Sequence, residues 1–237
     1  MADKYESKYT GEQIDAYLDD VATLKEQRAG ERLSILEKWM ADENYVKITA
    51  ILSVSPSTKE IGESVTNAQL AWSVSKETSS ITLDDVLVDG KTSYFDPNTY
   101  TANKTWTLKA TEKNGQSDGT CATVTATATL SFLNGVYYGV SSNGDIDNED
   151  TDAIIKFTKS LRSSKLTSFN VTAGDGEYIY YCLPKRMGAC SFKVGGFDGG
   201  FILQSEGAFT NASGYTETYY IYRSDNASLG ATSVTVT

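Results

Sequence analysis

The chain of 237 residues contains no histidine. Histidine is the usual general base near neutral pH and the commonest protein ligand of transition metals. Its absence excludes catalytic triads that use an imidazole and zinc sites that use histidine. We expect no catalytic residue, no metal and no cofactor.

Cysteine is also scarce, with only Cys121, Cys182 and Cys190. Three cysteines cannot form a closed disulfide framework. Cys182 and Cys190 can pair across a hairpin, but free thiols in a reducing compartment are the preferred interpretation.

Long apolar runs are missing as well. No stretch approaches the roughly 18 residues that a membrane span requires, and the polar start "MADKYESKYTG" lacks the apolar core of a secretory signal. The net charge of −10 gives no electrostatic support for binding a phosphate backbone. We expect a protein that is made in the cytosol without a leader and that binds neither membrane nor nucleic acid.

A helix is predicted over residues 10–43. Thr10 and Gln13 form a capping-box pattern, and apolar residues then recur at spacings of three and four, with an interruption at Gly30. Such a narrow stripe on a highly charged helix has no core of its own to cover, so we expect it to lie on another copy or a partner. Packing on the domain that follows is the alternative. The predicted oligomerisation and anchoring residues are Ile14, Leu18, Val21, Leu24, Leu33, Leu36, Trp39 and Met40.

Strands are predicted after this helical segment, which occupies residues 1–44. The stretch "TWTLKATEKNGQSDGTCATVTATATLSF" is typical of two strands joined by a turn at Asn114 and Gly115. Turn signals at intervals of about 8–12 residues, with Trp72 in an early strand, favour an Ig-like β-sandwich over residues 45–134.

A second β-domain, sandwich-like or jelly-roll-like, is predicted over residues 135–237, so the fold class is mainly β with an N-terminal helical segment. A turn at Asn134 and Gly135 would open this domain. Its one helix is expected over residues 150–161, because the acids of "DTDAIIKFTKSL" lie at the start and the lysines toward the end, as the helix dipole favours.

The acidic run 145–152 looks at first like a calcium loop. An EF-hand loop needs glycine at its sixth position and glutamate at its twelfth. Counted from Asp145, these positions hold Asp150 and Lys156. A solvated turn is therefore the preferred interpretation, and the question of a different cation site stays open.

The stretch "VGGFDGGF" resembles a phosphate-binding loop only in composition. No Lys-Ser/Thr pair follows it, and no helix is predicted after it whose N-terminus would hold an anion. We interpret the glycine pairs as turns, with Phe197 and Phe201 pointing inward.

Tyrosine is abundant, with fifteen in the chain, and it alternates with apolar residues in the C-terminal strands. Tyr178 and Tyr180 fall on one face of their strand, and Ile179 and Tyr181 on the other. We expect one face to belong to the core and the other to meet a neighbouring subunit or a glycan. The residues predicted for this surface contact are Tyr178, Tyr180, Tyr219 and Tyr222.

Several carboxylates lie close to these tyrosines in the sequence. Aromatic platforms suit sugars, and glycoside hydrolysis uses two carboxylates about 5–10 Å apart. No spacing singles out two members of the set. A carbohydrate-binding or polysaccharide-depolymerising protein is therefore the alternative function. The carboxylates considered are Asp175, Glu177, Asp198 and Glu206.

Several strings resemble virion proteins of tailed bacteriophages that infect Bacteroides-type hosts, crAss-like phages among them. "YTGEQIDAYLDDV" resembles an N-terminal segment of their fibre and appendage proteins. "EIGESVTNAQLAWSVSK", "KTWTLKATEKNGQ" and "TATLSFLNGVYYGVSS" resemble their Ig-like module. "YIYYCLPKRMGACSFKVGGFDGGF" and "TNASGYTETYYIYRSDNASLGATSVTV" are similar to their C-terminal β-domain.

This resemblance covers nearly the whole chain and carries no catalytic motif. It implies a non-enzymatic virion structural protein: a head-fibre, capsid-decorating or tail-appendage subunit. It also implies a homo-oligomer, commonly a trimer, with other virion proteins as partners. The N-terminal helix would anchor the subunit in the virion, and the β-domains would project outward, where a host-surface glycan is a further expected contact.

Overall fold

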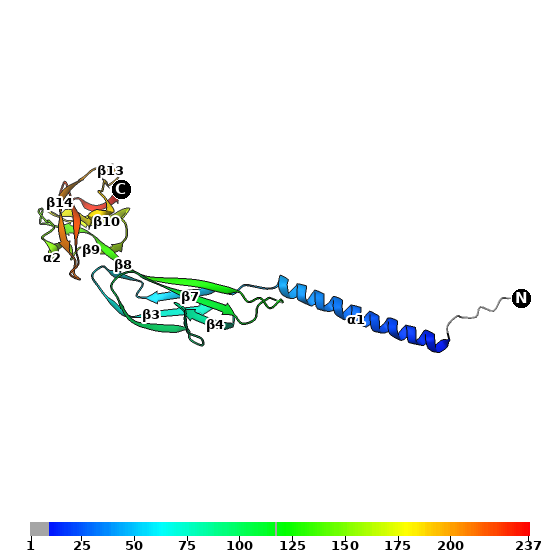
Figure 1. Cartoon of the computed structure of the whole chain (residues 1–237). Helices are drawn as coiled ribbons and strands as arrows, with labels where there is room; N and C mark the ends of the chain where they lie inside the picture. Colours follow the sequence, from blue (N-terminus) through cyan, green and yellow to red (C-terminus); the bar gives the residue numbers. More distant parts are fainter. Residues whose placement is uncertain (1–9, 117) are drawn as a thin grey trace. The chain divides into compact units, whose positions relative to one another are not determined.

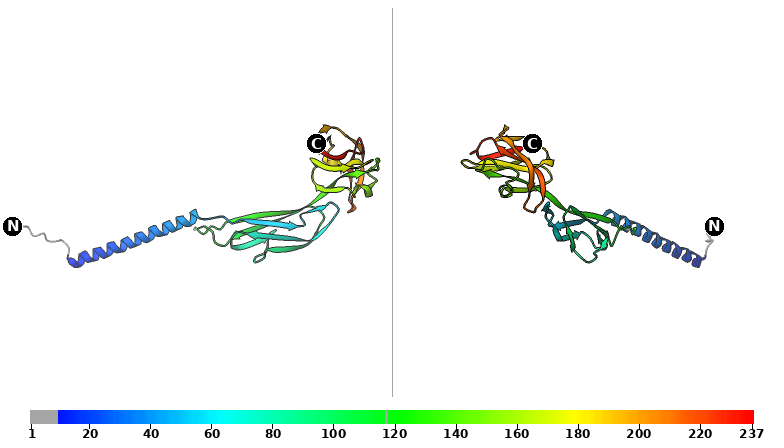
Figure 2. Two further views of the ribbon diagram at one scale, coloured as in Figure 1. Left: turned by 180° about the vertical axis from the view of Figure 1, so that it is seen from behind. Right: turned by 60° about the vertical axis from the view of Figure 1, so that its left-hand side comes forward.

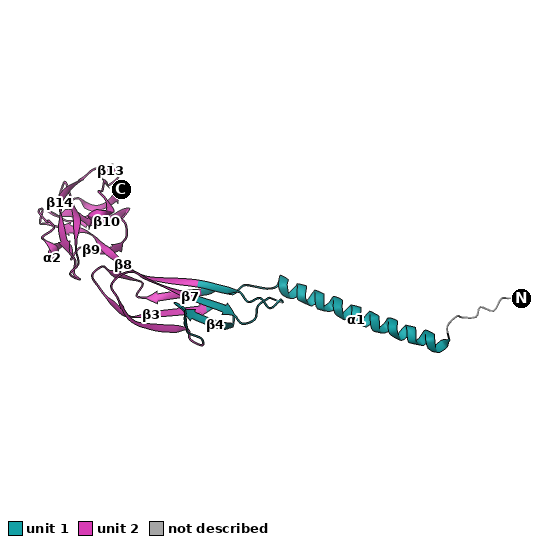
Figure 3. Cartoon of the chain, in the orientation of Figure 1, with its two compact units in different colours: residues 1–50, 74–89, 109–125 teal, residues 51–73, 90–108, 126–237 magenta. Residues whose placement is uncertain are grey.

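The computed structural model describes residues 10–116 and 118–237 (Figure 1). One long helix precedes a series of antiparallel sheets, which confirms the predicted mainly-β fold class. Residues 1–9 of the predicted helical segment 1–44 lie outside the described part of the chain. The chain divides into two compact units (Figure 3): residues 1–50, 74–89 and 109–125 in unit 1, and residues 51–73, 90–108 and 126–237 in unit 2.

Helix α1 (Gly11–Glu43) is one continuous helix in every view (Figures 1 and 2). The predicted capping box is confirmed: Thr10 Oγ1 accepts from the Gln13 amide at 3.3 Å, and the Thr10 amide donates to Gln13 Oε1 at 3.0 Å. The helix continues without a break through Gly30, where the apolar pattern is interrupted. A single glycine costs a helix only about 1 kcal/mol, which the continuous hydrogen-bond ladder absorbs.

The other elements are short, apart from one strand of nineteen residues. In chain order they are β1 (Ala50–Ser55), β2 (Thr58–Glu60), β3 (Val65–Val74), β4 (Thr78–Leu83), β5 (Val86–Leu87), β6 (Ser93–Tyr100), β7 (Lys104–Glu112), β8 (Thr123–Ser141), α2 (Thr151–Ile154), β9 (Thr158–Arg162), β10 (Ser168–Ala173), β11 (Tyr178–Pro184), the 3-10 turn η1 (Lys185–Met187), β12 (Phe192–Val194), β13 (Phe197–Asp198), β14 (Phe201–Thr210), β15 (Thr216–Ser224) and β16 (Gly230–Val236).

The first β-region of unit 2 has the alternating burial of a sandwich. Strand β3 lies between β1 and β6 in a three-stranded sheet, and β7 pairs with β8. Leu70 and Trp72 of β3 are buried, as are Trp106 and Leu108 of β7, whereas the residues between them are exposed or half-buried. The prediction that Trp72 is a buried residue of an early strand is confirmed.

A buried carboxylate organises part of this core. Asp96 Oδ2 accepts from Tyr100 Oη at 2.7 Å and from Trp106 Nε1 at 2.8 Å, and its Oδ1 accepts from Asn98 Nδ2 at 2.7 Å. Burial raises the pKa of Asp96, but the hydrogen bonds outweigh it, and the pKa is lowered overall.

The lowered pKa makes this carboxylate stabilising above its unfolded-state pKa of about 4, and the contribution is lost as the pH falls through the folded-state pKa. We therefore expect Asp96→Asn to destabilise the protein at pH 7, and we expect this cost to fall as the pH is lowered below about 4. Urea unfolding across this range measures the difference. A stability difference that does not change with pH would contradict the assigned role of Asp96.

The predicted hairpin between β7 and β8 is present, but Asn114 and Gly115 do not form a tight two-residue turn. The strands of unit 1 are closed by a hydrogen bond from the Glu112 amide to the Ala122 carbonyl at 3.0 Å, and a longer loop connects them. A Cβ on Gly115 would lie 1.9 Å from the Thr120 carbonyl oxygen, so this glycine permits two loop segments to approach closely.

The predicted turn at Asn134 and Gly135 is wrong, because β8 runs straight through both residues. On β8, residues 131–133 pair in parallel with β2, residues 134–138 pair with β9, and residues 137–141 pair with β11. Asn134 is buried. The division into domains at 134/135 stays a prediction, with β8 continuous across it.

Gly135 is required by its neighbour on the same strand. A Cβ at this position would lie 2.7 Å from the Tyr137 ring, whose hydroxyl is held by Glu60 Oε1 at 2.8 Å. We expect Gly135→Ala to lower the free energy of unfolding by about 1–3 kcal/mol, since overpacking strains a fixed ring. Urea unfolding measures this, with Gly30→Ala as the control because no atom lies within 4 Å of its added Cβ. Equal stability of Gly135→Ala and the parent chain would contradict the packing assigned to Tyr137.

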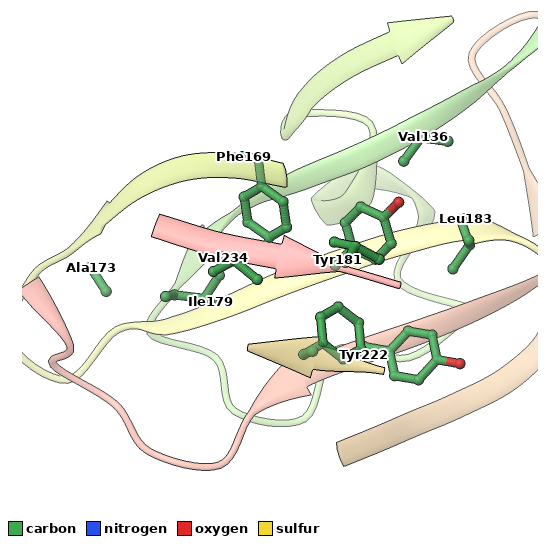
Figure 4. Close-up of a cluster of buried hydrophobic side chains, with 10 residues drawn as sticks. Val136, Phe169, Ala173, Ile179, Tyr181, Leu183, Tyr222 and Val234 are labelled. Atoms are coloured by element: carbon green, nitrogen blue, oxygen red, sulfur yellow. The ribbon is translucent and has the colours of Figure 1, made fainter. Parts of the chain in front are cut away.

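The C-terminal region of unit 2 is a sandwich of two sheets. One has the order β14-β15-β11-β8, with β9 also on β8, and the other has the order β10-β16-β12-β13. The apolar cluster between them is shown in Figure 4. Its buried members are Val136, Phe169, Ala173, Ile179, Tyr181, Leu183, Phe192, Tyr222, Val234 and Val236.

The other face of the first sheet is also covered. Here α2 and the loop before it supply Ile154 and Ile146, which are fully buried. The predicted helix over residues 150–161 is wrong: α2 has only four residues, and residues 158–162 form β9. Pairing of β9 with β8 and stacking of Phe157 on Tyr180, with ring centroids 5.8 Å apart, override the local charge pattern.

The N-terminal helix as the candidate interaction site

Helix α1 carries the largest set of exposed apolar side chains on a single element of the described chain. None of its residues is buried; Leu18 is 61% exposed and Trp39 is 59% exposed. All eight predicted anchoring residues are in this set, and two members, Tyr17 and Ile35, were not predicted. The full set is Ile14, Tyr17, Leu18, Val21, Leu24, Leu33, Ile35, Leu36, Trp39 and Met40.

These side chains form two blocks on one side of the helix. At 3.5 residues per turn, the period of a supercoiled bundle, Ile14, Leu18 and Val21 in the first block fall on the same line as Ile35 and Trp39 in the second. The spacing from Ile35 to Trp39 is the signal that could have identified Ile35 from the sequence. We call this line the α1 stripe.

Basic residues occupy the same line between the two blocks. Lys25, Arg28 and Arg32 follow Val21 at spacings of four, three and four. Within the described part of the chain, none of the three has an ion-pair partner, and Arg28 has Lys25 and Arg32 as its neighbours along the stripe. Like charges at these spacings destabilise an isolated helix. The α1 stripe therefore consists of an apolar block, a basic block (Lys25, Arg28 and Arg32) and a second apolar block.

The end of α1 is tied to the β-region of unit 1 by a buried carboxylate. Glu112 accepts from the Tyr45 hydroxyl, from the Ala122 amide at 2.8 Å and from Lys76 Nζ at 3.2 Å. The hydrogen bond to Glu112 raises the pKa of Tyr45 to about 12. Lys76 also lies 4.2 Å from the centre of the Tyr45 ring. These contacts fix the chain directly after the helix ends.

The predicted tyrosine surface is wrong for three of its four members. Tyr180, Tyr219 and Tyr222 are buried because β11 and β15 are inner strands of a sheet that is covered on both faces. The hydroxyls of Tyr180 and Tyr219 donate to backbone carbonyls at 2.7 and 2.8 Å. Tyr178 is half-buried, with the Arg223 guanidinium 4.7 Å from its ring centre.

The carboxylates considered for glycoside hydrolysis are each held by a different neighbour. Glu206 pairs with Lys185, and Asp198 pairs with Lys193 at 3.0 Å. The other two hold turns: Asp175 accepts from Ser228 Oγ at 3.3 Å, and Glu177 accepts from the Gly174 amide at 2.7 Å. These are the contacts of surface salt bridges and turns.

The acidic run 145–152 is stabilised by its own backbone. Asp147 Oδ1 accepts from the Glu149 amide at 2.8 Å, and Asp150 Oδ2 accepts from the Asp147 amide at 3.1 Å. Across residues 10–116 and 118–237, no group of three or more acidic or cysteine side chains is placed to hold a metal ion.

The glycine-rich stretch forms the β12–β13 hairpin. Phe197 is 81% exposed, so the prediction that it points inward is wrong. The flanking glycines all have positive φ and make the turns that were predicted. Phe201 does pack inward, with its ring centroid 4.4 Å from that of Phe192.

The cysteines form no disulfide, so pairing of Cys182 with Cys190 is not observed. Cys182 is buried and Cys190 half-buried, and burial raises the pKa of both thiols. Cys121 is exposed.

The chain matches no known protein family, and neither curated proteins nor solved structures gave a match. Among the described residues, no helix combines the length and the apolar character needed to cross a membrane.

Proposed function

We propose that this protein is a non-enzymatic structural subunit of a virion that assembles through α1. The observation that carries the proposal is the set of ten large apolar side chains exposed on one helix. Burying one such side chain stabilises an assembly by roughly 1.5–3 kcal/mol. Packing of α1 against other copies in a bundle of helices removes part of this surface from water.

The resemblance to fibre and appendage proteins of tailed bacteriophages supports the same function. It favours a trimeric head-fibre, capsid-decorating or tail-appendage subunit with other virion proteins as partners. The C-terminal β-region fits this function as a rigid module, because many of its aromatic side chains are packed in its two buried clusters. The α1 blocks would also provide the anchoring surface toward the virion.

Sedimentation equilibrium of the whole chain tests assembly. We expect a concentration-dependent trimer, with three times the chain mass of 25.8 kDa. In addition, an antibody against the chain should label virions released from cells that carry its gene. A monomer at every concentration, or unlabelled particles, would contradict the proposal.

Carbohydrate binding is not proposed as a second function. It depended on a tyrosine face next to paired carboxylates. Tyr180, Tyr219 and Tyr222 are buried, and the carboxylates are engaged in separate salt bridges and turns.

A further inference from the structure

The charges along α1 contain information about how copies would be oriented, given the proposed assembly through this helix. In a bundle of helices, the residues that face the neighbours recur at alternating spacings of four and three. On α1 these residues are Ile14, Leu18, Val21, Lys25, Arg28, Arg32, Ile35 and Trp39. The basic block therefore lies inside the seam, and its partners decide which arrangement is favourable.

A parallel arrangement in register places the basic residues against their own copies at the seam, but it also brings opposite charges together at the flanks. Leu18, Lys25, Arg32 and Trp39 recur every seven residues along the seam. The residue directly before each of them lies at the edge of the seam, beside the neighbouring helix. Glu31 of one copy then lies beside Arg32 of the next copy. Lys38 lies seven residues after Glu31 and occupies the same edge position. In this arrangement it lies beside Glu43 of the next copy.

An antiparallel arrangement with full overlap gives the opposite result. Pairing Ile14 with Trp39 of a second copy places Lys25 against Arg28 in both directions. The flanks also lose their pairs, because Glu31 then meets Leu24 of the second copy. Like charges at a buried seam are costly. This arrangement has no opposite-charge contact to offset the basic block.

We propose that copies of α1 associate in parallel and in register, and that Glu31–Arg32 and Lys38–Glu43 contacts between copies select this register. The apolar blocks supply the attraction at both ends of the stripe. The basic block meets like charges in both the parallel and the fully overlapping antiparallel arrangement, so the flanking opposite-charge contacts are what favour the parallel one. Lysine and arginine can occupy such inner positions because their long apolar stems allow the charged ends to reach the flanking carboxylates. A single polar inner residue is known to fix register at a cost in stability.

Charge exchange at one contact tests the register. We expect Glu31→Arg to weaken self-association about tenfold, since three repulsive contacts replace three attractive ones in a trimer. Adding Arg32→Glu to the same chain restores opposite charges between copies and should recover most of the loss. Glu37→Arg is the matched control, because Glu37 lies on the opposite side of the helix from the stripe and should leave the association constant unchanged. Failure of the double variant to recover association would overturn the Glu31–Arg32 contact.

Disulfide trapping tests the orientation in the full chain. All chains carry Cys121→Ser, because Cys121 is exposed and would form disulfides that do not report on the helix. Leu18→Cys alone should cross-link rapidly between copies if the helices are parallel. In the antiparallel arrangement Leu18 faces Ile35, so cross-linking would require a mixture of Leu18→Cys and Ile35→Cys chains. That result would overturn the parallel register. An assembled sample that cross-links in neither case would also overturn it. If the parent chain is monomeric at all concentrations, the proposed function itself fails, so the two failures are distinguishable.

Discussion

Replacing Leu18 and Val21 together by aspartate is expected to convert the assembly into monomers while the β-regions stay folded. Both side chains lie on the α1 stripe and are exposed in the single chain. Their burial between copies is expected to contribute roughly 1.5–3 kcal/mol each per chain. Aspartate removes this contribution and adds like charges at every contact. Sedimentation equilibrium measures the mass, and near-UV circular dichroism reports the packing of the buried tyrosines.

The matched control for this variant is the pair Ala16→Asp and Thr23→Asp. It adds the same two charges to the opposite side of α1, about half a turn from the stripe. We expect this control to assemble like the parent chain. If both variants dissociate equally, the effect is one of net charge or helix stability and the stripe is not the interface. If neither dissociates, α1 does not mediate assembly.

The second large effect is expected at a buried ion pair in unit 2. Glu60 is 1% exposed and accepts from Tyr137 Oη at 2.8 Å and from Lys159 Nζ at 2.7 Å. Lys159→Met leaves the buried carboxylate with one neutral donor. Removing one partner of a buried pair costs 3–5 kcal/mol, and because Lys159 is partly exposed we expect the lower end, about 3 kcal/mol.

Urea unfolding of the single and double variants separates this ion pair from general packing. Lys159→Met combined with Glu60→Gln removes both charges and keeps the shapes close to those of the parent. Replacing both partners of a buried pair is often nearly neutral. We expect the double variant to recover most of the stability lost in Lys159→Met. A double variant at least as unstable as the single one would show that the carboxylate charge is not the cause.

The parts of the fold that the sequence predicted well are those set by neighbouring residues. Helix α1 and its capping box depend on Thr10, Gln13 and the spacing of apolar residues within a few turns. The alternation around Trp72 identified a buried strand face for the same reason. Ile35 was missed although the same spacing reaches it, because the basic block hides the continuity of the stripe.

The errors occurred where distant segments decide the local structure. Asn134 and Gly135 form a turn in many sequences, but here both residues pair with β9, and β8 pairs with β2 and β11 on either side of them. Residues 158–162 have a helix-like charge pattern, yet they complete a sheet. No local pattern shows that β11 is covered on both faces, so Tyr180 was assigned to the surface.

Amide hydrogen exchange of the whole chain at several concentrations tests most directly whether other copies cover α1. An isolated exposed helix opens readily, whereas a helix packed in a bundle opens only when the bundle dissociates. We predict that protection of residues 14–40 rises steeply with protein concentration, while protection of the β11 amides stays constant. Rapid exchange of residues 14–40 at every concentration would contradict the central role of α1 in assembly.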